Sequence, residues 1–159
     1  MIRNKAWPLL AALMVAAPLA LAQPVVSYTK AGAKFEDVRD DLKSAIESRG
    51  LVVDYQSHIG RMLERTGKDV GSAKPLYAEA QALQFCSAVL SRKTMEADPA
   101  NVVFCPYTIV VYATAQQPDR VTVTYRRPLR PGAAPASRAA LREVDALLDG
   151  IAREAVGRK

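Results

Sequence analysis

Two cysteines are the residues of this sequence best able to do chemistry. Cys86 and Cys105 are the only cysteines in the chain. In an oxidising compartment such a pair forms a disulfide, and a bridge here would restrict the unfolded chain by roughly 3 kcal/mol. The same thiols could instead act as a redox couple, carry a sulfane sulfur or hold a soft metal ion. We expect a structural bridge and keep redox or sulfur chemistry as the alternative, because the spacing is too wide for a Cys-x-x-Cys motif.

The supply of metal ligands is small. Zinc sites use four ligands, and copper(I) sites prefer thiolate, imidazole or thioether groups. Beyond the two cysteines and the N-terminal segment, the chain offers His58, Met62 and Met95. The number of these residues would permit a soft-metal site, but it is the only feature that supports one. We therefore expect no metal and no cofactor, and keep metal binding as the weakest alternative.

Four further residues are candidates for an accessory site. His58 is the only histidine, so any general-base scheme must use it, but its neighbours indicate a turn. Asp98 precedes a proline and is typical of a turn cap, Tyr107 lies on a β-prone run, and Arg126 begins a basic stretch. The sequence contains no glycine-rich phosphate loop. We assign no catalytic residue and expect a protein that is not an enzyme.

The basic stretch has two interpretations. It either forms a solvated face or binds an anionic lipid surface or an acidic ligand. We do not expect nucleic acid as a partner, because the N-terminus, described next, indicates export, and exported proteins seldom meet nucleic acid. The arginines of this stretch are Arg126, Arg127, Arg130, Arg138 and Arg142.

The N-terminus has the order of a secretory signal peptide. Two basic residues precede an apolar run, which ends in the small-x-small triplet Ala20-Leu21-Ala22. We therefore expect residues 1–22 to be cleaved, leaving residues 23–159 periplasmic or secreted, with no stable membrane span. Of the 22 Lys and Arg residues, two lie in this segment, so the 16 Asp and Glu residues leave the remainder a net charge near +4. The length of residues 23–159 suits one domain with one hydrophobic core.

Two amphipathic helices are predicted. Apolar residues recur at steps of three and four over residues 34–49 and again over residues 137–156. Gly50 stands where a left-handed residue would end the first helix. A shorter helix is expected near residues 61–68, and a short helical turn within residues 91–101, where an Asp-Pro step stops it.

Several β-prone runs predict an antiparallel sheet of about five strands. We expect the second strand to pair with the first, residues 76–82 to be helix or loop, and residues 120–125 to alternate Val and Tyr with Thr. This predicts an α+β single domain with helices on one face of the sheet. The polar other face is then either exposed or a homodimer interface. The expected strands lie near residues 25–28, 51–55, 83–90, 108–114 and 120–125.

Five short motifs, in order and spacing, resemble exported members of the bacterial "domain of unknown function 302" family, over about residues 25–156. The resemblance implies a compact α+β fold with an antiparallel sheet and helices on one side, and it implies no activity or catalytic residue. Many members of the family lack the cysteine pair. The motifs are Phe85-Cys86-Ser87-Ala88, Met95-Glu96-Ala97-Asp98-Pro99-Ala100-Asn101, Cys105-Pro106-Tyr107, Tyr112 and Tyr125-Arg126-Arg127-Pro128.

We therefore expect an exported binding or accessory domain for a small molecule or a protein partner. Its binding surface would be formed by the sheet together with the connector over residues 91–106.

Overall fold

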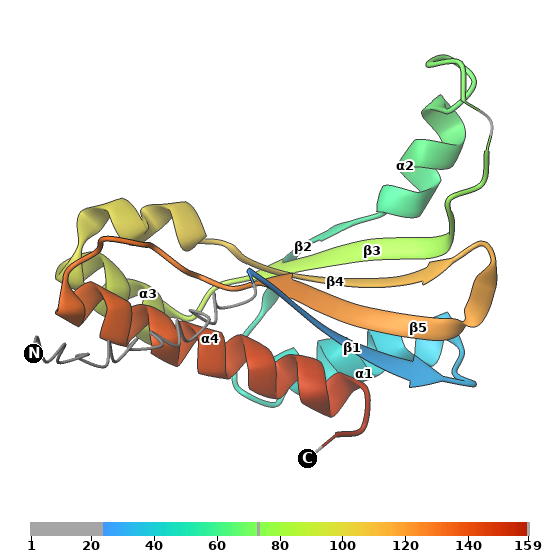
Figure 1. The fold of residues 1–159 in the computed structure, drawn as a ribbon. Coiled ribbons are helices and arrows are strands. Elements are labelled where there is room, and N and C mark those ends of the chain that lie inside the picture. The colour runs from blue at the N-terminus through green and yellow to red at the C-terminus, as the bar shows by residue number, and fades with distance from the viewer. Residues whose placement is uncertain (1–23, 73, 159) are drawn as a thin grey trace, which may run out of the picture.

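The computed structural model describes residues 24–72 and 74–158. The expected signal peptide lies outside these residues. The described chain is an α+β domain whose helices and strands alternate irregularly (Figure 1). The elements in chain order are β1 (Val25–Ala31), α1 (Phe35–Glu47), β2 (Val53–Ser57), α2 (Ile59–Thr66), β3 (Tyr77–Phe85), α3 (Ala88–Ala97), the 3₁₀ helix η1 (Pro99–Phe104), β4 (Tyr107–Thr114), β5 (Gln117–Arg126) and α4 (Pro135–Ala155).

The five strands form one antiparallel sheet in the order β1-β5-β4-β3-β2. The expected pairing of the second strand with the first is wrong, because β1 and β2 lie at opposite edges. Helix α1 separates the two strands and carries the chain across the sheet, which leaves the inner edge of β1 for β5. The β4–β5 hairpin forms the middle of the sheet.

Helices α1 and α4 cover one face of the sheet, as the two amphipathic stripes predicted (Figure 1). Each presents apolar residues to the inward-facing side chains of the central strands, and Leu42, Ile46, Val144 and Ile151 are almost completely buried. Helix α1 ends as expected, with Gly50 in the left-handed conformation at φ +71°. No described helix is both long and apolar enough to cross a bilayer.

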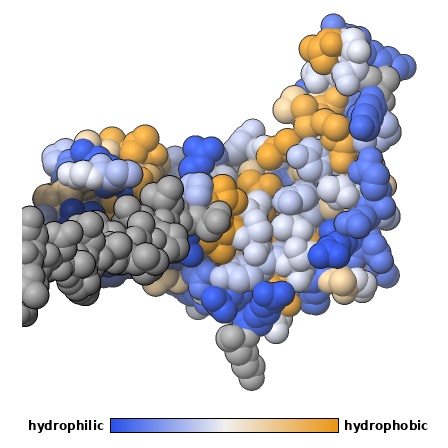
Figure 2. Space-filling view, viewed as in Figure 1, coloured by the Kyte–Doolittle hydropathy of each residue, from blue (hydrophilic) through white to orange (hydrophobic). Residues whose placement is uncertain are grey.

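The opposite face of the sheet carries hydroxyls and small residues. Along β4 the odd-numbered residues are buried against the helices and the even-numbered ones are half-buried on this open face. Cross-strand hydroxyl pairs, Ser27 with Thr124 at 2.8 Å and Thr29 with Thr122 at 3.0 Å, join β1 to β5. The predicted polar face is thus present. In Figure 2, hydrophobic surface gathers on the α2 arm and on the α3–η1 lobe, and smaller hydrophobic areas lie among hydrophilic surface between them.

Strand β3 and helix α3 differ from expectation. Residues 77–82, expected to be helix or loop, belong to β3, and residues 88–90, expected to end a strand, begin α3. The Ala, Glu and Gln residues of this stretch favour helix locally, but pairing with strands on both sides decides its conformation. Helix α3 begins at Ala88 because the Ser87 hydroxyl accepts a hydrogen bond from the Leu90 N–H, at 3.3 Å.

Candidate functional site

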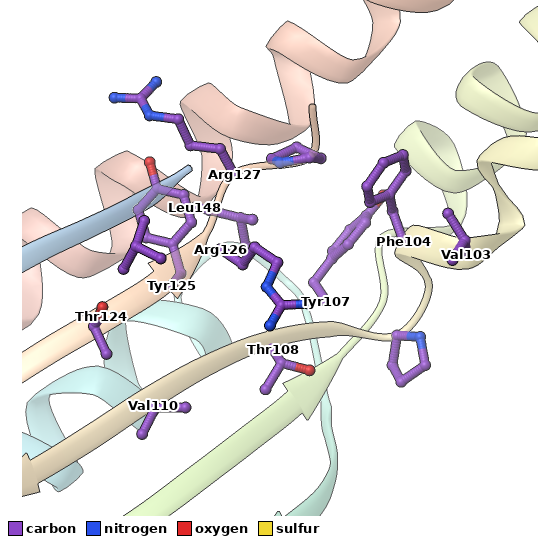
Figure 3. A pocket seen from close by; sticks show the side chains of 13 residues that line it. Val103, Phe104, Tyr107, Thr108, Val110, Thr124, Tyr125, Arg126, Arg127 and Leu148 are labelled. Carbon is purple, nitrogen blue, oxygen red and sulfur yellow. The ribbon is translucent and has the colours of Figure 1, made fainter. Parts of the chain in front are cut away.

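A pocket of about 450 Å³ opens where the sheet meets the α3–η1 lobe (Figure 3). One wall comes from η1. The opposite wall comes from the C-terminal end of β5 and the N-terminal end of β1, and the floor comes from the start of β4. Two of its apolar residues are strongly exposed: Val103 keeps 73% of its surface accessible and Val25 keeps 51%. The residues that line the pocket include Val25, Val103, Phe104, Thr108, Val110 and Arg126.

The pleat of the sheet explains why these side chains face the pocket. Thr108 and Val110 occupy the open-face positions of β4, whose intervening residues point into the core. Arg126 ends β5 and is paired with Val25 of β1. Figure 3 shows the Arg126 side chain reaching across the pocket toward Thr108, whereas Arg127 points away from it.

Arg126 differs from three of the other arginines of its stretch, whose side chains have partners. Arg127 Nη1 donates to Asp145 Oδ2 at 2.5 Å, Arg130 is paired with Asp98, and Arg138 donates to a backbone carbonyl. The side chain of Arg126 has neither an ion pair nor a hydrogen bond with any described residue. Its guanidinium is therefore the unneutralised charge of the pocket.

The back of the pocket is built from buried tyrosines. Tyr107 packs edge-to-face on Phe85, with ring centroids 6.0 Å apart, and its hydroxyl lies 3.2 Å from the Ser91 hydroxyl. Burial raises the pKa of Tyr107, and it raises the pKa of Tyr125 further, helped by the nearby Asp145 carboxylate. Both phenols stay neutral at physiological pH and are already hydrogen-bonded within the fold, so they serve as walls rather than as acids or bases.

Comparison with known proteins identifies a family and a solved structure with the same fold. The family model described as "Domain of unknown function DUF302" matches residues 26–155. The chain belongs to the DUF302 family. A solved structure, that of an uncharacterised conserved DUF302 protein from Bacillus stearothermophilus, shares the fold with a TM-score of 0.70 at 13% sequence identity, covering 84% of this chain and 99% of the other. No curated protein matches the chain.

The predicted accessory residues of this DUF302 domain do not form one group. Tyr107 and Arg126 both line the pocket. Asp98 lies within the lobe, between α3 and η1, and His58 precedes α2, which stands at the other end of the sheet from α3 and η1 (Figure 1). His58 is exposed, and its side chain caps no backbone N–H of α2.

Asp98 is part of the structural frame of the lobe. Its carboxylate accepts the Ala100 N–H at 3.0 Å, as expected of a turn cap, and also pairs with Arg130. The backbone hydrogen bond and, next, the side-chain hydrogen bond from Arg130 lower the pKa of Asp98. Asp98 thereby joins η1 to the Pro-rich segment between β5 and α4.

Cys86 and Cys105 are paired as the sequence suggested. Their sulfurs lie 2.28 Å apart, at disulfide distance, with Cα atoms 6.4 Å apart. Cys86 follows β3 and Cys105 follows η1, so the pair connects the sheet to the C-terminal end of the pocket wall. The Ser91 hydroxyl lies 3.7 Å from the Cys105 sulfur.

Sequence reasoning missed the apolar and hydroxyl residues of the pocket. The sequence pattern indicates only a connector for Val103 and Phe104, and only the start of a strand for Thr108. A usable signal did exist: an uninterrupted apolar run, Val102 to Phe104, in a segment too short and too constrained by Pro99 to bury all of it.

Proposed function

We propose that this protein is an exported, non-catalytic binding domain whose ligand occupies the pocket between η1 and the open face of the sheet. The observation that carries the proposal is the pocket itself: about 450 Å³ of space, lined by exposed apolar side chains and held open by a tethered wall. Ligand sites are usually preformed concavities of this size with a few polar groups.

The polar groups of the pocket favour binding over catalysis. The described lining residues provide one free guanidinium, from Arg126, and threonine hydroxyls. An acid–base reaction would need a group that exchanges protons near neutral pH. The histidine lies at the far end of the sheet, and the buried tyrosines have raised pKa values.

The pairing of Cys86 with Cys105 supports the proposed export. Disulfides persist in the periplasm and outside the cell, where a signal peptide over residues 1–22 would send the domain. In this proposal the bridge is structural and fixes one end of η1. The alternative is a redox or sulfur-handling role for the same pair.

Binding can be tested with a neutral apolar fluorophore, N-phenyl-1-naphthylamine. We expect saturable one-to-one binding that falls at least about tenfold in Val110→Phe, because the larger ring fills the pocket. The matched control is Val70→Phe, at an exposed position outside the pocket. Absence of one-to-one binding, or equal loss in both variants, would refute the binding proposal.

Export and the role of the bridge have a separate test. Intact mass of protein recovered from the periplasm, before and after reduction and alkylation, should show a chain beginning at Gln23 with two thiols that react only after reduction. The double variant Cys86→Ala/Cys105→Ala should unfold with about 3 kcal/mol less free energy. A reduction potential well above about −300 mV would instead favour the redox alternative.

A further inference from the structure

We propose that the ligand of this pocket is an amphipathic organic anion, whose charged group binds Arg126 and whose apolar body lies against η1. This inference rests on the proposed binding function and names the chemical class of the ligand. It is carried by the charge balance of the pocket and by the separation of its polar and apolar walls.

The charge balance favours an anion. None of the described residues that line the pocket is an Asp or Glu, and Arg126 has no partner of its own in the described chain. The Thr108 hydroxyl, toward which Arg126 extends in Figure 3, also has no hydrogen-bond partner among those residues. Guanidinium and hydroxyl together offer several donors, which suit the oxygens of a carboxylate, sulfonate or phosphate.

The remainder of the pocket favours an apolar body. Val103 and Phe104 face the charged side from η1, and Val25 and Val110 continue the apolar surface on the sheet. Exposed single valines are ordinary, but here they gather around one concavity. A small inorganic anion would leave this surface in water, whereas an amphipathic ligand covers it.

A second copy of the chain is a poorer occupant. The open face carries Arg126 at the pocket and, three rows along the sheet and outside the pocket, Arg120, which pairs with Ala31. The open-face partners on neighbouring strands, such as Ser27, Thr124 and Ala82, are uncharged. Two copies meeting through this face would bring these like-charged arginines toward one another.

Two fluorophores that differ only in charge test the inference. 1-Anilinonaphthalene-8-sulfonate has the aromatic body of N-phenyl-1-naphthylamine plus a sulfonate. We expect the full-length mature protein to bind the sulfonate at least about tenfold more tightly than the neutral dye, because a charge-assisted hydrogen bond offsets the loss of hydration.

Variants at Arg126 locate the effect. Arg126→Gln should reduce the affinity ratio of the two dyes to about two or less, and Arg126→Lys should keep part of the preference. Arg120→Gln and Arg142→Gln remove charges outside this pocket and should leave the ratio unchanged.

Three results would overturn the inference. They are equal or tighter binding of the neutral dye by the wild type, a ratio unaffected by Arg126→Gln, and equal effects of all three glutamine variants. In each case one-to-one binding of the neutral dye, if present, leaves the proposed binding function intact. Failure of both dyes to bind refutes that function itself.

Discussion

Replacement of Asn101 by alanine should strongly destabilise the fold, although Asn101 lies in a short 3₁₀ helix at the surface of the lobe. Its side chain is almost fully buried, with 1% of the residue exposed. The amide nitrogen donates to the Thr94 carbonyl at 2.8 Å and to the Ser137 hydroxyl at 2.9 Å, and the amide oxygen accepts from Arg130 at 3.2 Å. One side chain thus joins α3, α4 and the segment that follows β5.

The expected loss follows from these partners. Each of the three hydrogen bonds contributes about 1 kcal/mol net, and the buried Thr94 and Ser137 groups would be left without this partner, so Asn101→Ala should cost about 3 kcal/mol. That is a large part of the roughly 5–15 kcal/mol that stabilises a domain of this kind. With a urea m-value of about 1.5 kcal/mol/M, the unfolding midpoint should fall by about 2 M.

Urea titration monitored by circular dichroism provides the measurement. Val102→Ala is the matched control, because Val102 is the next residue of η1 and is 58% exposed, so its truncation should stay within about 0.5 kcal/mol. A loss below about 1 kcal/mol in Asn101→Ala, or a loss no larger than the control's, would refute the assignment of Asn101 as the junction of the lobe.

A double-mutant cycle with Ser137→Ala sharpens this test. The Ser137 hydroxyl is completely buried and bonds only to the Asn101 amide among the described side chains. The two losses should therefore be less than additive, by about 1 kcal/mol. Additive losses would show that the two groups act independently.

Two further predictions concern α2 and the acid stability of the domain. Gly60→Ala should lower the free energy of unfolding by about 1–3 kcal/mol, because the new Cβ would lie 2.9 Å from the backbone nitrogen of Ala80. Gly150→Ala is the control in the same urea titration, because its new Cβ would have its nearest contact 3.6 Å away, on the flexible side chain of an arginine. Burial opposes ionisation of Asp149, but hydrogen bonds from Tyr28 and Arg153 outweigh it and lower the pKa of that carboxyl. Its stabilisation is therefore present above about pH 4 and lost as pH falls through the lowered pKa. Asp149→Asn should flatten the dependence of unfolding free energy on pH below about pH 4, and an unchanged slope would contradict this.

Local patterns predicted the helix-covered half of the fold well. Helices α1 and α4 each carry a long apolar stripe, and such stripes require a sheet or helix to cover them. The Val/Tyr and Thr alternation of β5 likewise predicted which of its sides is polar. These features depend on periodicity within one segment, which the sequence displays directly.

The rest depends on partners far away in the chain. Nothing within residues 77–82 marks a strand, since Ala, Glu and Gln favour helix. This part of β3 forms because β4 and β2 pair with the two edges of the strand. The position of β2 at the far edge is likewise set by the path of α1 across the sheet. Apart from the apolar run of η1, the pocket could not be predicted for the same reason, because its walls come from η1, β4, β5 and β1 and meet only in the folded chain.

The short motifs that carried the family resemblance explain why the pocket has a fixed wall. The Asp98–Asn101 segment anchors the start of η1 through Arg130 and Ser137, and the pairing of Cys86 with Cys105 holds its end. Between these anchors the middle of η1 turns Val103 toward solvent at the pocket mouth. A segment that served stability alone would gain by burying such a valine. Two fixed ends with an exposed apolar middle instead form a preorganised surface, which loses little entropy when a ligand binds.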